Sequence, residues 1–271
     1  MKKKYELIPS DIDGLFRVKA LRNFANVKKG DIGGYVKSEN NLSHDGHCWV
    51  YDNAVVRNNA QVYGNAVVRG NARVYGNALV CDKAHVYDNA VVCGIASVRD
   101  NAVVCGNAFV CDDAVVRNNA HVYDNAQVCG NAVVCGIASV RDNAVVCGNA
   151  RVSDNAEVYG DARVYGEAWV YGNAEIRGNG DYIVFKNWWS SCRFFTWTRS
   201  NNMWKVGCFY GTGKELIEKA YEDSDESGLH YKEIVEYVEK CVLNKKVKSL
   251  KKFGSVKKLL YLCTTKLINN T

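Results

Sequence analysis

The chain has 271 residues, of which 24% are charged, and its formal net charge is +6. This length can bury a sizeable core, and we expect it to fold as two units. Met1 to Asp11 carries three lysines with no apolar run behind them, a pattern that excludes a signal peptide or a membrane span in this segment. We therefore expect a cytoplasmic protein.

The sequence contains 12 cysteines. Most of them occupy positions of a repeat, and a reducing compartment keeps thiols free, so we expect no disulfide framework. No CxxC motif and no Cys/His cluster with zinc spacing occurs. The sequence therefore predicts neither a metal site nor a cofactor.

Residues 1–49 are predicted to form an N-terminal capping segment. This segment holds a glycine-rich stretch, Gly30 to Val36, followed by Asn41-Leu42-Ser43 and Cys48-Trp49. His44 and His47 also lie in it, and we expect them to help cap the first coil of the structure that follows.

Residues 50–180 repeat with a period of six. Val stands at position 50 and at every sixth residue to Val170, with Ile176 in the last place, and Ala keeps the same period from Ala54 to Ala174. A helix would repeat its face near seven or eleven residues, so six indicates a short strand plus a corner. The unit V-x-[GDN]-N-A-x points Val and Ala inward, and its Gly, Asp or Asn residues tolerate the positive φ of a turn.

Three such units would close an 18-residue coil. About seven coils would then stack at roughly 4.8 Å, with each Val above another Val in a dry interior. A column of asparagines would share amide hydrogen bonds between coils. Its members are Asn53, Asn71, Asn89, Asn107, Asn125 and Asn143.

This pattern resembles the hexapeptide-repeat left-handed β-helix superfamily, which implies an all-β solenoid that is a left-handed parallel β-helix. The stretch Gly33-Gly34-Tyr35-Val36, followed by Cys48-Trp49-Val50-Tyr51-Asp52-Asn53-Ala54, looks like the opening segment of uncharacterised bacterial and phage β-helix proteins. That likeness implies a phage or mobile-element protein that acts on its host, in counter-defence, in the host cell's cytoplasm.

One of the three outward faces is nearly uncharged in its middle four coils. A patch of a few hundred Å² on a monomer usually has a partner, so we expect this face to form a homo-oligomer or to dock another domain. Isolated apolar residues on a β surface also occur without any partner. In a reducing cytosol, stacked cysteines there are more often small, moderately apolar residues than reactive or metal-binding thiols. The interface candidates are Val91, Cys93, Phe109, Cys111, Cys129, Val145 and Cys147.

An internal duplication bears on catalysis. Residues 91–108 and 133–150 are identical and lie 42 residues apart. That displacement is seven repeats, which is not a whole number of coils, so the copy falls on a different face from its original. The duplication therefore favours a spacer or a broad surface over a catalytic centre.

Residues 181–271 are predicted to form a small α+β C-terminal domain with a basic helical tail. Strands are expected over 181–210 with a hairpin turn at Ser200-Asn201-Asn202. A helix is predicted to follow from Thr212 through Tyr221, with two more over residues 231–242 and 256–267. From Lys240 to Thr271 there are nine lysines and no acid, so this tail is one candidate surface for nucleic acid.

Aromatic and cationic residues interleave in the strands of this domain, as they do in proteins that bind single-stranded nucleic acid. The alternative is a small hydrophobic core with solvated charges around it. The candidates for binding nucleic acid or another partner are Trp188, Trp189, Arg193, Trp197, Arg199, Trp204 and Lys205.

These features together predict a non-enzymatic scaffold or binding protein that presents its C-terminal module to an unidentified host macromolecule. The alternative is an acyltransferase with a CoA or carrier-protein donor, an activity that the superfamily resemblance implies. Such an enzyme needs a general base, usually a histidine, and the weak candidates are His85 and His121. No loop is inserted between Val50 and Ile176 to build a wall around a substrate.

Overall fold

The computed structural model of the chain describes residues 3–243, with side chains described to residue 240. Its contacts divide the chain into two compact units, Met1–Thr212 and Gly213–Thr271. The helix predicted over residues 256–267 and most of the basic tail lie outside the described residues. The predicted domain boundaries after residues 49 and 180 stay predictions.

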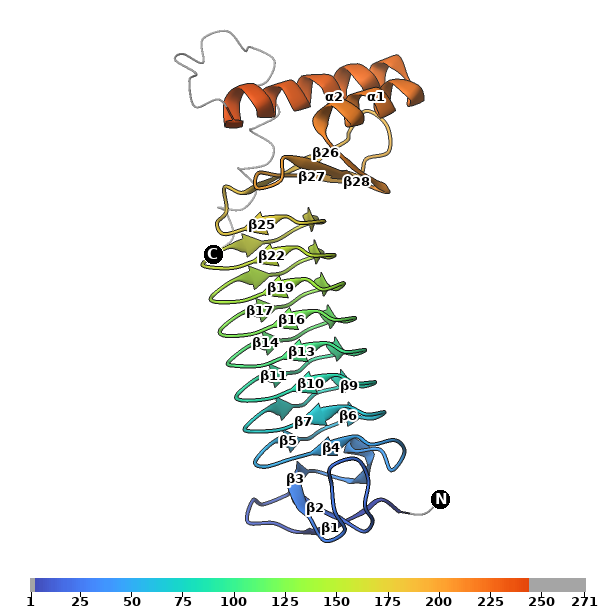
Figure 1. Cartoon of the computed structure of the whole chain (residues 1–271), viewed down its shortest axis with the longest axis vertical. Coiled ribbons are helices and arrows are strands. Elements are labelled where there is room, and N and C mark those ends of the chain that lie inside the picture. The colour runs from blue at the N-terminus through green and yellow to red at the C-terminus, as the bar shows by residue number, and fades with distance from the viewer. Residues whose placement is uncertain (1–2, 244–271) are drawn as a thin grey trace. The chain divides into compact units, whose positions relative to one another are not determined.

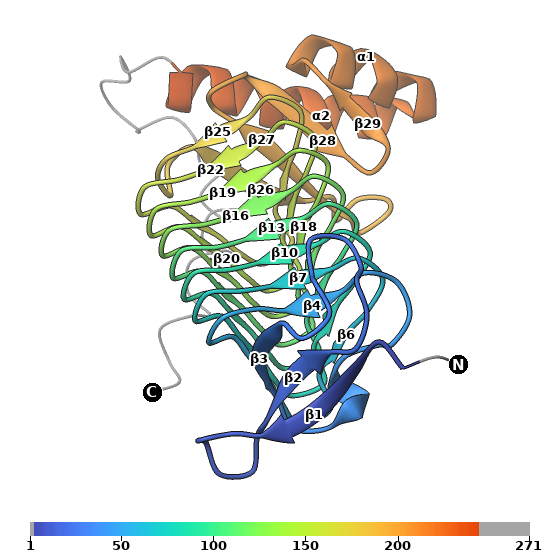
Figure 2. The same cartoon turned by 60° about the horizontal axis from the view of Figure 1, so that its bottom comes forward.

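The chain opens as an antiparallel meander. Strands β1 (Tyr5–Pro9), β2 (Phe16–Ala20) and β3 (Ile32–Val36) pair in that order. The last two residues of β3 then pair in parallel with β5 (Val55–Val56), so the meander continues directly into the first sheet of the solenoid (Figure 2). A Cβ atom on Gly33 would lie 2.3 Å from the Val50 carbonyl oxygen, and one on Gly34 would lie 2.6 Å from that of Ala54. The glycine pair therefore lets β3 lie against the next coil.

The first parallel coil includes residues that precede Val50. Val36 and Leu42 are buried like the later valines, and Leu42 bridges in parallel to Val62. A short 3-10 helix, η1 (Glu39–Asn41), lies between them. The solenoid therefore has about eight turns instead of seven, and the predicted parallel β-helix is confirmed.

Successive coils contribute one two-residue strand to each of three parallel sheets, and the coils stack one above another in Figure 1. The ten-stranded sheet runs β1, β2, β3, β5, β8 (Arg73–Val74), β11 (Val91–Val92), β14 (Phe109–Val110), β17 (Gln127–Val128), β20 (Val145–Val146) and β23 (Arg163–Val164). The eight-stranded sheet runs β4 (Trp49–Val50), β7 (Val67–Val68), β10 (His85–Val86), β13 (Val103–Val104), β16 (His121–Val122), β19 (Ser139–Val140), β22 (Glu157–Val158) and β25 (Glu175–Ile176). The seven-stranded sheet runs β6 (Gln61–Val62), β9 (Leu79–Val80), β12 (Ser97–Val98), β15 (Val115–Val116), β18 (Val133–Val134), β21 (Arg151–Val152) and β24 (Trp169–Val170).

The repeat residues take the places that their pattern predicts. The Val and Ala of every repeat are at most 1% exposed, so the interior is a stack of aliphatic side chains. The second residue after each Val, from Asp52 to Gly172, has a positive φ and is always Gly, Asp or Asn, the types that adopt this conformation at least cost.

The predicted asparagine column is confirmed over most of its length. Asn71 donates its side-chain amide to Asn89 at 3.2 Å, and the same contact recurs at each coil up to Asn143. Asn143 then donates to the Asp161 carboxylate at 3.1 Å. These exposed bonds link neighbouring coils at one corner.

A four-stranded antiparallel sheet follows the last coil. Its strands are β26 (Tyr182–Lys186), β27 (Phe194–Thr198), β28 (Met203–Val206) and β29 (Phe209–Gly211). The predicted hairpin turn joins β27 to β28, with Asn202 at φ 52°. Hydrogen bonds join this sheet to the last coil, as between the Tyr182 hydroxyl and the Arg163 carbonyl oxygen at 2.9 Å.

The second unit is helical. Helices α1 (Gly213–Asp223) and α2 (Asp225–Tyr237) are followed by a π-helical turn, η2 (Val238–Leu243). The Ser224 side chain caps α2 by accepting from the Ser227 backbone N–H. The first helix was predicted close to its observed bounds, whereas α2 begins at Asp225, before the predicted start at residue 231. None of the helices in the described part of the chain is long and apolar enough to span a membrane.

Candidate functional site

The nearly uncharged face lies on the ten-stranded sheet. Val91 pairs with Phe109, Phe109 with Gln127, and Gln127 with Val145, so the predicted register is correct. In the isolated chain Val91 is 8% exposed, while Phe109 and Val145 are half-buried. Neighbouring side chains therefore already cover part of this face.

The four outward cysteines of that face form one column, which we call the cysteine column: Cys93, Cys111, Cys129 and Cys147. Backbone hydrogen bonds of 2.9 to 3.0 Å hold each of them one coil from the next. Burial raises the pKa of Cys111 to about 12, and the neighbouring Asp112 and Cys129 add to the effect. Burial also raises the pKa of Cys129, with Cys147 adding. At neutral pH these two central groups are therefore protonated thiols.

His85 and His121 lie on the eight-stranded sheet but do not form a pair. Val103 stands between them, in register with both. Burial and then the charge of Arg69 lower the pKa of His85. A hollow of about 470 Å³ lies over His121, lined also by Tyr87, Cys105, Tyr123, Ser139 and Glu157.

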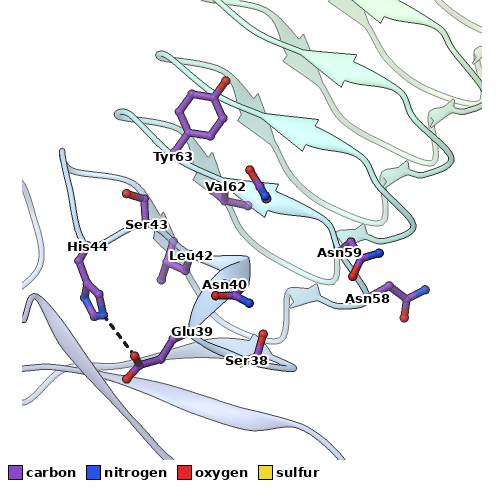
Figure 3. Close-up of a pocket in the computed structure, with 11 residues that line it drawn as sticks. Ser38, Glu39, Asn40, Leu42, Ser43, His44, Asn58, Asn59, Val62 and Tyr63 are labelled. Carbon is purple, nitrogen blue, oxygen red and sulfur yellow. Dashed lines mark ion pairs between the residues drawn. The ribbon is translucent and has the colours of Figure 1, made fainter.

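A larger hollow, of about 550 Å³, opens beside the first coil and was not predicted. Its lining comes from η1 and the segment after it, and from the next coil, and includes Glu39, His44, Asn59 and Tyr63 (Figure 3). His44 Nε2 lies 3.9 Å from the Glu39 carboxylate. Its Nδ1 accepts from the Lys4 backbone N–H at 3.2 Å. The sequence signal for this hollow was the step of eight residues, in place of six, from Leu42 to Val50.

His44 and the first strand close the N-terminal end of the solenoid. The His44 ring stacks on Tyr5 with a centroid separation of 4.2 Å. Lys4 is fully buried, and its ammonium donates to the Cys48 carbonyl oxygen at 2.9 Å and lies 3.2 Å from the Cys48 sulfur. Burial lowers the pKa of Lys4, and the Cys48 thiol opposes that shift. These contacts cap the N-terminal end of the solenoid, which is the role that was expected of His44.

The predicted binding residues of the four-stranded sheet divide into two groups. Trp197 and Trp204 are at most 2% exposed and pack with Phe195 as an aromatic core. Lys205 is 9% exposed, and its ammonium lies 4.3 Å from the centre of the Tyr171 ring in the last coil. Trp189 is half-buried, whereas Trp188, Arg193 and Arg199 are exposed.

Several exposed aromatic and cationic residues lie in the β26–β27 connection or next to its ends. Lys186 and Phe194 are register partners, with the ammonium 5.6 Å from the ring centre. Trp188 is 56% exposed and Phe194 43%. The Arg193 carbonyl oxygen accepts from the Asn187 backbone N–H at 2.8 Å and so holds the connection closed. We call Lys186, Trp188, Arg193 and Phe194 the aromatic–cationic patch.

A family model described as "YdcK Beta solenoid repeat" matches three stretches of the chain, residues 60–74, 72–88 and 156–172. The chain is a β-helix repeat protein. The matched stretches cover coils near each end of the solenoid. None of them includes the opening segment or residues 181–271. No curated protein matches this β-helix protein.

Proposed function

We propose that this β-helix protein is a non-enzymatic scaffold that holds a binding region, within residues 181–271, toward a macromolecular partner. The observation that carries the proposal is the aromatic–cationic patch, which sits on a sheet anchored to the last coil. Trp and Arg are enriched among residues that dominate binding energy at interfaces. Exposed aromatic rings near cations, such as Phe194 beside Lys186, also suit stacking on a nucleic-acid base.

The solenoid suits the role of a stiff support. Its coils are joined by backbone hydrogen bonds on three sheets from Tyr35 to Ile176, with no inserted loop from Val50 onward. In a solenoid each coil contacts only its neighbours, so stiffness depends on the regularity of these contacts. The regular spacing therefore keeps the anchored sheet at a fixed distance from the N-terminal end.

The partner proposed is a macromolecule of a bacterial host cell. The support is the likeness of the opening segment to phage β-helix proteins, together with the exposed cations of the patch, which favour an acidic protein surface or a nucleic acid. Self-association through the nearly uncharged face is a separate part of the proposal.

Site-specific photo-crosslinking tests the scaffold role. A photo-reactive phenylalanine derivative replaces Trp188 in the full chain, and as a control it replaces Ile137, which is 57% exposed at a corner of the solenoid. In host cells we expect one dominant crosslinked macromolecule from position 188 and none from position 137. Identical products from both positions, or no product from position 188, would contradict the proposal.

Acyl transfer is the second candidate, because the hollow over His121 places a potential general base beside polar groups. Calorimetry of the full chain with CoA separates the two candidates. The scaffold proposal expects no binding heat. Micromolar affinity for CoA that is lost in His121→Ala would favour the enzyme.

A further inference from the structure

The cysteine column brings soft ligand atoms together in a way that other outward columns do not. Its strands β11, β14 and β17 follow one another along one side of the solenoid (Figure 1). Among the described residues, no other outward column has cysteines on consecutive coils. Cys105 is flanked by Tyr87 and Tyr123, and Cys135 by Arg117 and Ser153.

The centre of the column is a compact set of donors. The sulfurs of Cys111 and Cys129 and a carboxylate oxygen of Asp112 all lie within 4.8 Å of one another. The Asp112 carboxylate accepts from the Gly130 backbone N–H at 3.0 Å, which fixes it on the turn. The donors are therefore positioned by the stacking of two coils before any ion arrives.

The chemistry of these donors favours a cation. The site offers two cysteine sulfurs and one carboxylate oxygen within reach of a single ion. A bound metal ion displaces the thiol protons to solvent. Thiolate sulfur selects soft ions such as Cu(I), and also Zn(II).

The coil spacing distinguishes between these ions. Stacked strands lie about 4.8 Å apart, and the sulfurs of Cys111 and Cys129 lie within 4.8 Å of each other. With a metal–sulfur bond of about 2.3 Å, two thiolates on opposite sides of one ion lie about 4.6 Å apart. A linear two-thiolate ion therefore matches the strand spacing, whereas a tetrahedral ion needs a sulfur–sulfur distance that is shorter than this spacing.

We propose that the cysteine column binds a thiophilic d¹⁰ metal ion between the thiolates of neighbouring coils, with Cu(I) in linear coordination at Cys111 and Cys129 as the expected occupant. Binding removes one proton from each thiol and leaves the oxidation state of the metal and of sulfur unchanged. The proposal does not rest on the aromatic–cationic patch, but its cysteines lie on the nearly uncharged face that is also proposed for self-association.

The test measures metal affinity of the full chain without oxygen, by competition of Cu(I) against a chromophoric chelator and, in a parallel arm, of Zn(II). The variant Cys111→Ser/Cys129→Ser leaves Cys93 and Cys147 three coils apart and so removes every neighbouring pair. We expect at least one Cu(I) per chain, and a loss of more than about 100-fold in affinity in this variant, since even partners outside the ligand set are worth about 10–100-fold.

Two controls keep the result specific. Cys105→Ser/Cys135→Ser removes the same number of thiols from other faces and is expected to keep full Cu(I) affinity. Asp112→Asn keeps an acceptor for Gly130 and tolerates the positive φ, so it should cost Cu(I) less than about tenfold but cost Zn(II) more, because carboxylate suits the harder ion. Circular dichroism establishes that each variant is folded.

X-ray absorption at the copper edge gives the coordination directly. Two sulfur neighbours are expected. Equal Cu(I) affinity in the wild type and in Cys111→Ser/Cys129→Ser would overturn the proposal, as would an equal loss in the Cys105→Ser/Cys135→Ser control. Tighter retention of Zn(II), with loss on Asp112→Asn, would support the site but overturn linear Cu(I) as its occupant.

Discussion

The backbone N–H of Trp169, in the last coil, donates to the hydroxyl of Thr196 in β27 at 2.9 Å. In lower coils the equivalent N–H donates to an Ala carbonyl oxygen one coil above, as Arg151 does to Ala168. No coil lies above Trp169, so a side chain takes over. Asn179 and Ser200 accept in the same way from Arg163 and Glu175, so all three sheets of the solenoid are capped.

This cap makes the stability of the last coil depend on Thr196, which is 1% exposed. Thr196→Val keeps the shape of the side chain but leaves the Trp169 N–H without its acceptor. We expect a loss of about 1–3 kcal/mol in the free energy of unfolding, measured with urea. Ser97→Ala, at an outward position in mid-solenoid, is the matched control and should change it little; equal losses would show that the cap bond is not what stabilises this end.

An inward charge in mid-solenoid should be far more damaging. Val104 is fully buried, and Val104→Asp would place a carboxylate among valines with no partner. The cost exceeds what a domain with about 5–15 kcal/mol of stability can absorb, so we expect the solenoid to unfold, as followed by circular dichroism on heating. Arg99→Glu, on the outer surface, should melt like the wild type.

The stacked His44 should make stability depend on pH. Burial lowers the pKa of His44 below its ordinary value of 6.5, although Glu39 opposes the shift. The unfolded chain then binds a proton more readily than the folded chain, so this contribution is complete above pH 6.5 and is lost as the pH falls toward the lowered pKa. We expect urea unfolding of the wild type to lose more stability between pH 7 and pH 5 than that of His44→Gln; parallel curves would contradict this.

Self-association through the nearly uncharged face has its own test. Phe109 is half-buried in the isolated chain, with Val91 and Gln127 as register partners. Phe109→Lys would place a charge where a second copy is predicted to pack, so we expect light scattering to report a smaller particle. A particle of the same size as the wild type would contradict a role for this face in self-association.

Much of the solenoid could be predicted because one residue type recurs at one position. The Val period fixes which residues stack, so the pairing of Phe109 with Gln127 followed from counting. The first coil was missed because the step from Leu42 to Val50 is eight residues long. The two additional residues of that step help to form the hollow around His44. They do not follow the six-residue repeat, so the repeat could not predict them.

The binding residues of the four-stranded sheet were harder to predict, because strand alternation shows which residues share a face but not what covers it. Trp197 and Trp204 share one face and form a core, while Thr196 and Lys205 share the other and contact the last coil. Burial of both faces depends on contacts with distant residues. Trp188 stays exposed because it lies in the connection, outside the strands.

The most direct measurement compares how much partner copurifies with three full-length chains from host cells. They are the wild type, the patch variant Trp188→Ala/Arg193→Ala, and the double variant His85→Ala/His121→Ala. We expect the partner to be absent from the purified patch variant and to copurify with the histidine variant at the wild-type level. The reason is that the proposed role is binding, not turnover. Full recovery with the patch variant, or loss confined to the histidine variant, would contradict the scaffold role.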